Sequence, residues 1–269
     1  GINNTFVGGL AGDSVTTGSY NTLLGSIAGD ALTTANSNVA VGYSALGADT
    51  LGAKNVAVGV SALLTQNFTT ATDSFNTGVG HNAGKLITTG INNTLIGATS
   101  GDAITTGQQN TAVGRAALGA TTTANNNTAM GYYALTSNTT AADNTAFGAS
   151  ALGANTTGSQ NTAVGKGAGL SVTTGIENVL IGALAGDALT DADYNVALGY
   201  SALGAAITSD GNTAIGRYAL LSDTQGNLNV AVGRDALRAQ NMGSDLDSYN
   251  TAVGALAGTA VTTGIYNTL

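Results

Sequence analysis

The sequence contains no cysteine, no proline and no tryptophan. The lack of cysteine excludes a disulfide framework and thiolate metal sites. The lack of proline is typical of a chain whose backbone N–H groups are needed as donors in a β-ladder. Aromatic residues make up only 5% of the chain, whereas hydrophobic residues make up 43%. A core is therefore expected, but one built mainly from small side chains.

Charge is scarce as well, at 8% of residues against roughly 25% in ordinary soluble domains. Fifteen acids against seven bases give a net charge of −8. This balance argues against nucleic acid as a partner, because phosphate binding needs clustered Lys and Arg. No apolar run approaches the roughly 18 residues that cross a bilayer, so no membrane insertion is expected in this segment.

A repeat of 17 residues organises the whole chain. Its anchors are Asn4, Asn21, Asn38, Asn55, Asn76, Asn93, Asn110, Asn127, Asn144, Asn161, Asn178, Asn195, Asn212, Asn229, Asn250 and Asn267. Thirteen of the fifteen intervals are 17 residues, and the other two, after Asn55 and Asn229, are 21. With the anchor as position 1, position 2 is Thr or Val, position 4 is always apolar and position 5 is always Gly.

This repeat predicts an all-β fold, a parallel β-solenoid (β-roll) of about fifteen coils. Seventeen residues are too few for the helix pair of the common helical repeats. The anchor segment is expected to form a short strand that ends at a Gly turn. A second strand is expected near the Thr-Thr pair at positions 13 and 14, as at Thr16 and Thr17.

The repeats fall into two kinds, which we call Gly-type and Leu-type after the residue at position 9. In seven repeats position 9 is Gly and position 12 is a large aliphatic residue, as in Gly29 and Leu32. In the other eight position 9 is Leu, and in the six of normal length position 12 is small or polar, as in Leu203 and Ala206. Close packing explains this exchange if the two positions fill one interior space.

The repeats are grouped into super-repeats of five coils each. Gly-Ile precedes the anchors Asn4, Asn93, Asn178 and Asn267, and both four-residue insertions fall in the fourth coil, within 64–75 and 238–249. Both insertions are therefore expected to bulge from the same edge. We interpret residues 1–269 as a single continuous repeat domain, an excerpt of a longer array with super-repeats beginning near residues 4, 93 and 178.

The asparagines are the main candidate site, either a row of ligands or a structural ladder. In stacked coils, equivalent Asn side chains lie above one another, and their amides can hydrogen-bond along the axis. Buried amides need such partners. We favour the structural ladder.

No catalytic, cofactor-binding or metal-binding set stands out, and an enzyme is not expected. The one histidine, His81, lies at a turn position. Gly-Asp recurs at Asp13, Asp30, Asp102 and Asp187, once per coil, which does not match the nine-residue unit of calcium-binding β-rolls. We favour a turn-stabilising role for these acids.

Tyrosines gather on either side of the anchor strand. Tyr43, Tyr132 and Tyr200 occupy position 6, whereas Tyr20, Tyr194 and Tyr249 directly precede an anchor. Such rings suit stacking on surface glycans or packing between neighbouring chains, and we favour the interface slightly.

Segments 161–169 (Asn-Thr-Ala-Val-Gly-Lys-Gly-Ala-Gly) and 38–47 (Asn-Val-Ala-Val-Gly-Tyr-Ser-Ala-Leu-Gly) resemble the head repeat of YadA-type trimeric adhesins. They are more similar still to the repeat shaft of phage tail-fibre-like proteins. The resemblance implies a left-handed β-roll, three identical chains side by side, and an extracellular, cell-surface or virion fibre that attaches to surfaces or displays a tip. The adhesin repeat is shorter, so a wider coil is expected here.

Two other functions stay open. One is a self-assembling extracellular matrix filament, in which open strand edges template end-to-end growth. The other is an ice-binding solenoid, for which regular Thr arrays are suited, although three coils replace the Thr pair.

Overall fold

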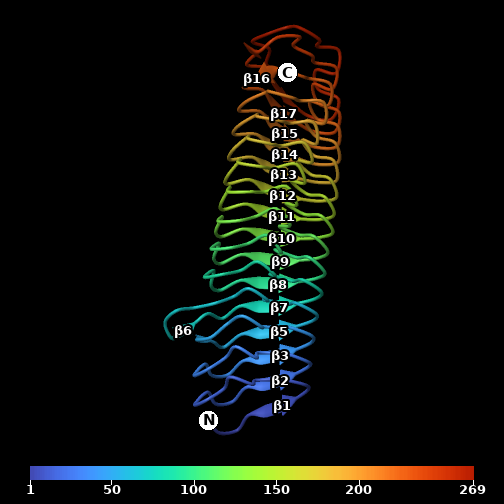
Figure 1. Cartoon of the computed structure of the whole chain (residues 1–269). Coiled ribbons are helices and arrows are strands. Elements are labelled where there is room, and N and C mark those ends of the chain that lie inside the picture. Colours follow the sequence, from blue (N-terminus) through green and yellow to red (C-terminus); the bar gives the residue numbers. More distant parts are fainter. The chain divides into compact units, whose positions relative to one another are not determined.

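The computed structural model describes all residues from Gly1 to Leu269. It is an all-β parallel β-solenoid of about fifteen turns with no helix, which confirms the predicted fold class (Figure 1). The chain divides into two compact units, Gly1–Tyr133 and Ala134–Leu269. This boundary lies inside the repeat that begins at Asn127, away from the expected super-repeat starts near 93 and 178. The single continuous domain stays a prediction.

The first unit has one three-residue strand per turn. These strands are β1 (Thr5–Val7), β2 (Thr22–Leu24), β3 (Val39–Val41), β5 (Val56–Val58), β7 (Thr77–Val79), β8 (Thr94–Ile96), β9 (Thr111–Val113) and β10 (Thr128–Met130). Each pairs in parallel with the strand of the next turn, with equivalent positions facing each other, as Thr94 faces Thr111.

The second unit repeats this arrangement. Its strands are β11 (Thr145–Phe147), β12 (Thr162–Val164), β13 (Val179–Ile181), β14 (Val196–Leu198), β15 (Thr213–Ile215), β17 (Val230–Val232) and β19 (Thr251–Val253). Neighbours again pair in parallel and in register, as Thr162 with Val179. In both units the strand pairing therefore joins equivalent positions of successive repeats.

The Gly at position 5 ends each strand, as expected. Its φ lies between 129° and 150° in all fifteen turns, a region that L side chains rarely adopt. The turns also lie close together at this corner, because a Cβ on Gly97 would come within 2.6 Å of the Gly114 carbonyl oxygen. Glycine is thus required here both for its conformation and for the close approach of two backbones.

The corner after each strand also places residues other than glycine in the left-handed region. A residue other than glycine lies in this region at position 7 in every turn but one, as at Thr99 with φ 55°. All eight leucines of position 9 also lie in it, as at Leu46 with φ 54°. Leucine and threonine disfavour this conformation, so residue preferences could not predict it. Hydrogen bonds and the buried Leu side chains hold the corner in place.

The expected second strand near the Thr-Thr pair is wrong for most turns. These segments are bends, joined to the next turn by bonds such as Thr88 N–H to the Thr105 carbonyl at 2.9 Å. The Thr88 hydroxyl donates to the same carbonyl at 3.1 Å, so the side chain supplements the backbone instead of extending a strand.

Additional strands form only at the two insertions. β4 (Gly52–Ala53) pairs with β6 (Thr72–Asp73), and β16 (Gly226–Asn227) pairs with β18 (Leu246–Asp247). Both pairs lie at the same place in the repeat, just before the anchor strand. That the two insertions bulge from the same edge stays a prediction. Figure 1 shows the β6 segment projecting beyond its neighbouring turns.

The exchange between positions 9 and 12 is confirmed by the core. Leu203 and Leu32, one from each kind of turn, are buried, and a Cβ on Gly186 would lie 2.7 Å from Leu189 Cδ1. The two positions therefore compete for one space.

Position 3 is a third contributor to this space that the sequence analysis missed. Where a Gly-type turn follows a Leu-type turn, position 3 is small, because the preceding leucine reaches over it. Leu63, for example, lies within 2.9 Å of where a Cβ on Gly78 would be. Where a second Gly-type turn follows, position 3 is itself leucine, as at Leu95 and Leu180, and is buried.

Candidate functional site

The anchor asparagines line the inside of each unit, one above the other. From Asn21 to Asn250 they are at most 1% exposed. Each Oδ1 accepts the backbone N–H of the next anchor, as Asn76 Oδ1 accepts from Asn93 N at 2.9 Å. This series runs from Asn4 to Asn127 in the first unit and from Asn144 to Asn267 in the second.

The amide nitrogens complete the ladder. In most turns Nδ2 donates to the carbonyl 14 residues further on, as from Asn93 to Gly107 at 2.9 Å. Direct bonds between amides also occur, as from Asn110 Nδ2 to Asn93 Oδ1 at 3.1 Å. The asparagines thus bond chiefly to backbone, where the sequence analysis expected amide-to-amide bonds. Because these amides are buried and satisfied, they are closed to a ligand.

A second ladder runs on the outside of the turn, at position 16. There a backbone N–H donates to the side chain of position 16 one turn later, as from Gln108 to Asn125 at 2.7 Å. In the second unit this ladder passes through Ile176, Asp193, Asp210 and Asn227, with distances of 2.7 to 2.8 Å. The stacked acids at Asp193 and Asp210 therefore act as acceptors for backbone. Their signal in sequence is the recurrence of Ser, Asn or Asp two residues before an anchor.

Each insertion encloses a buried polar network that the sequence analysis did not foresee. Gln66 Nε2 donates to Asp49 Oδ2 at 2.7 Å, and Asn76 Nδ2 donates to Gln66 Oε1 at 2.8 Å. The N–H groups of Gly52 and Phe68 donate to Asp49 Oδ1 at 3.0 and 3.3 Å.

The second insertion repeats this network with Asp223, Gln240 and Asn250. At both insertions an Asp and a Gln occupy position 12 of consecutive repeats, a pattern found nowhere else in the chain, and this is the signal that could have revealed the network. The network fixes the longer turn to its neighbours, because every buried polar group in it has a partner.

Burial governs the electrostatics of several acids. Burial raises the pKa of Asp49, more than its hydrogen bonds from Gln66 and from backbone lower it. The pKa values of Asp102 and Asp187, at the Gly-Asp turns, are raised by the same cause. Burial, with the nearby Asp193, Asp245 and Asp191 carboxylates, also raises the pKa of Asp210.

Each strand has two outward positions, of which position 2 is Thr in most turns and position 4 is always apolar, which is unusual for a sheet exposed to water. Position 4 points outward and is apolar in every turn: Val7, Leu24, Val41, Val58, Val79, Ile96, Val113 and Met130 in the first unit, and Phe147, Val164, Ile181, Leu198, Ile215, Val232 and Val253 in the second. Leu24 and Phe147, for example, are 44% and 49% exposed. We call these the position-4 rows. The alternation of side chains along a strand predicts these rows, because an inward Asn at position 1 places position 4 on the outside.

The candidate tyrosines are all exposed. Tyr43, Tyr132, Tyr200, Tyr20, Tyr194 and Tyr249 are 45% to 59% exposed. Most lie several turns apart, so they do not form continuous stripes. Neighbouring turns bring together only Tyr200 with Tyr218, edge to face at 5.5 Å, and Tyr249 with Tyr266, stacked at 5.4 Å.

No group of side chains is arranged to hold a metal ion. His81 is exposed, as expected, and the chain nowhere gathers three or more His, Cys, Asp or Glu side chains able to hold a metal ion. None of its segments is a helix with the length and hydropathy of a membrane span.

The fold and these ladders define a class, the parallel β-solenoids built from a short repeat with a buried asparagine ladder. No family model matches the chain, and comparisons with curated proteins and with solved structures find no match either.

Proposed function

We propose that this chain is the repeat shaft of an extracellular fibre, of the adhesin or phage tail-fibre-like kind, in which identical chains associate side by side. The observation that supports this most is the pair of position-4 rows. Contiguous apolar surface on a soluble chain marks an interaction site, because leaving it in water has a free-energy cost.

The partner that fits these rows is another copy of the chain. A position-4 row presents one apolar side chain per turn, at the spacing of parallel strands, about 4.8 Å. A second copy carries the same row at the same spacing, so side chains can interdigitate turn after turn. The resemblance to trimeric fibres supports three copies.

The mass of the assembled particle in solution tests this proposal, measured by sedimentation or light scattering. A mass of three chains supports the fibre. A single chain at all concentrations overturns it, and open-ended polymers point instead to the matrix filament.

A matched pair of variants tests the surface. Leu24 lies in a position-4 row and is 44% exposed. Leu86 is 45% exposed but occupies position 11 of its repeat, outside the row. We expect Leu24→Lys combined with Ile96→Lys to release single folded chains, because two charges would be buried at the interface. Leu86→Lys should leave the particle mass unchanged. Equal effects of both changes would contradict an interface at the row.

A further inference from the structure

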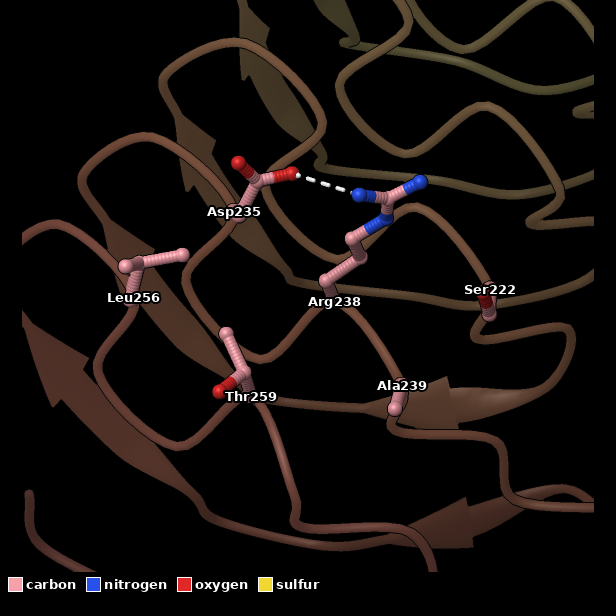
Figure 2. Close-up of a pocket in the computed structure, with 6 residues that line it drawn as sticks. All are labelled: Ser222, Asp235, Arg238, Ala239, Leu256 and Thr259. Atoms are coloured by element: carbon pink, nitrogen blue, oxygen red, sulfur yellow. Dashed lines mark hydrogen bonds and ion pairs between the residues drawn. The ribbon is translucent and has the colours of Figure 1, made fainter.

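A shallow groove lies on the turns that follow β15, β17 and β19 in the second unit. It encloses about 330 Å³ and is lined by Ser222, Asp235, Arg238, Ala239, Leu256 and Thr259 (Figure 2). Two of the lining side chains are short, Ala239 at position 11 and Thr259 at position 10. The volume is at the lower end for small-molecule sites.

Positive charge concentrates beside this groove. Arg217, Arg234 and Arg238 are three of the seven basic residues of a chain whose net charge is −8. One acid partners two of them: Asp235 accepts Arg238 Nη1 at 3.1 Å and lies 3.3 Å from Arg234 Nε. Arg217 forms no ion pair, and its guanidinium donates to the Tyr218 hydroxyl at 3.2 Å. Three guanidinium groups and one carboxylate leave a net positive site on an acidic protein.

The site is also aromatic. The Tyr218 ring lies 4.4 Å from the Arg217 guanidinium and 5.1 Å from that of Arg238. Tyr200 packs edge to face against Tyr218 and is itself 46% exposed. These cation–π contacts hold the arginines in place, so little ordering is needed when a ligand binds. The open ring of Tyr200 offers a face for the C–H groups of a sugar.

We propose that Tyr200, Arg217, Tyr218, Arg234, Asp235 and Arg238, the arginine–tyrosine site, bind an anionic saccharide, one that carries carboxylate or sulfate groups. The anionic group is held by the guanidiniums of Arg217 and Arg238, which suit bidentate binding of planar or tetrahedral oxyanions. Asp235 accepts hydrogen bonds from hydroxyl groups of the same sugar, and the sugar ring rests on Tyr200. This inference deepens the proposed attachment role by naming its ligand class, and it rests on that role.

Asp235 favours a saccharide over an acidic peptide. Its side chain is only 13% exposed, fixed between two arginines at the edge of the groove. A run of carboxylates along the groove would meet this fixed negative charge. A sugar instead alternates anionic groups with hydroxyl donors and matches both kinds of protein group.

Titration calorimetry with the full chain tests the site. The probes are a heparin oligosaccharide, an oligogalacturonate, a neutral malto-oligosaccharide and an oligoglutamate peptide, each at two salt concentrations. We expect binding of at least one anionic saccharide, weaker at high salt, and none of the neutral sugar. No binding of either anionic sugar, or equal binding of oligoglutamate, overturns the proposal.

Variants locate the binding. Arg238→Gln and Arg217→Gln should each weaken it by roughly tenfold, the effect of one lost charge-assisted bond. The control is Arg115→Gln, because Arg115 also occupies position 6, with its guanidinium 5.6 Å from the Tyr133 ring, but is not among the residues that line the groove. Unchanged affinity in Arg238→Gln, or an equal loss in Arg115→Gln, contradicts the site. Particle mass measured on the same samples separates failure of this site from failure of the fibre.

Discussion

The amide oxygen of Asn93 accepts a hydrogen bond of 3.1 Å from the backbone N–H of Asn110, one repeat further along the chain. The amide nitrogen of Asn93 donates to the Gly107 carbonyl at 2.9 Å within the same turn. One side chain thus ties two successive turns together and closes its own turn. Because this occurs in almost every repeat, the ladder is the feature on which the fold depends.

Removal of one ladder amide should therefore be costly. Asn93→Ala leaves the Asn110 N–H and the Gly107 carbonyl buried without these partners, and each such group costs about 1 to 3 kcal/mol. We expect the free energy of unfolding to fall by roughly 3 kcal/mol in urea titrations. Gln108→Ala, an exposed change in the same turn, should stay within about 0.5 kcal/mol. Equal effects of the two changes would show that the ladder is not stabilising.

The packing exchange can be tested with a double-mutant cycle in one Leu-type turn. Leu203→Gly opens a cavity and should cost roughly 3 kcal/mol or more, whereas Ala206→Leu overpacks the same space and should cost about 1 to 3 kcal/mol. Together they recreate the pattern of Gly186 and Leu189. We expect the double variant to lose less free energy of unfolding than the two single losses added together, by about 1 kcal/mol or more. Additive losses would mean that the two positions do not share a space.

The corner glycine should tolerate no side chain. In Gly97→Ala the new Cβ would lie 2.6 Å from the Gly114 carbonyl oxygen, and the φ of 131° is itself unfavourable for alanine. Backbone atoms cannot move aside as side chains can, so we expect a loss of roughly 3 kcal/mol or more, measured by thermal and urea unfolding. Gly243→Ala is a suitable control, because open space surrounds that residue. A fully stable Gly97→Ala variant would contradict the close approach of the turns.

Mild acid should stabilise the chain. Asp49, Asp102, Asp187 and Asp210 all have pKa values raised above their ordinary value of 3.8, in each case chiefly by burial. A carboxyl with a raised folded pKa binds its proton more tightly in the folded chain. Its contribution to stability is therefore present at low pH and is lost as pH rises from about 3.8 through the folded pKa.

Urea unfolding midpoints between pH 7 and pH 4 measure this effect. We expect the midpoint to rise on acidification and the rise to be smaller in Asp102→Asn. A midpoint that falls steadily over this range would contradict the assignment.

Single tyrosine changes should leave the fold intact. Tyr43 is 56% exposed, whereas Leu46, in the same turn, is fully buried. Tyr43→Ala should shift the free energy of unfolding by no more than about 0.5 kcal/mol, and Leu46→Ala should cost about 2 to 5 kcal/mol. Loss of folding in Tyr43→Ala would place this ring in the core.

The sequence by itself determined the repeat, the strand at each anchor, the glycine corner and the exchange between Gly29-Leu32 and Leu203-Ala206 patterns. These follow from local rules: a period, strand and turn preferences, and the requirement that an interior space be filled once. Tertiary structure decided the rest. It turned the Thr pairs into bends and placed Leu46 and Thr99 in the left-handed region. It also brought Asp49 to Gln66 and Arg238 to Tyr218. The physical reason is that stacking sets which groups meet across turns, so hydrogen bonds and packing between repeats override the preferences of single residues.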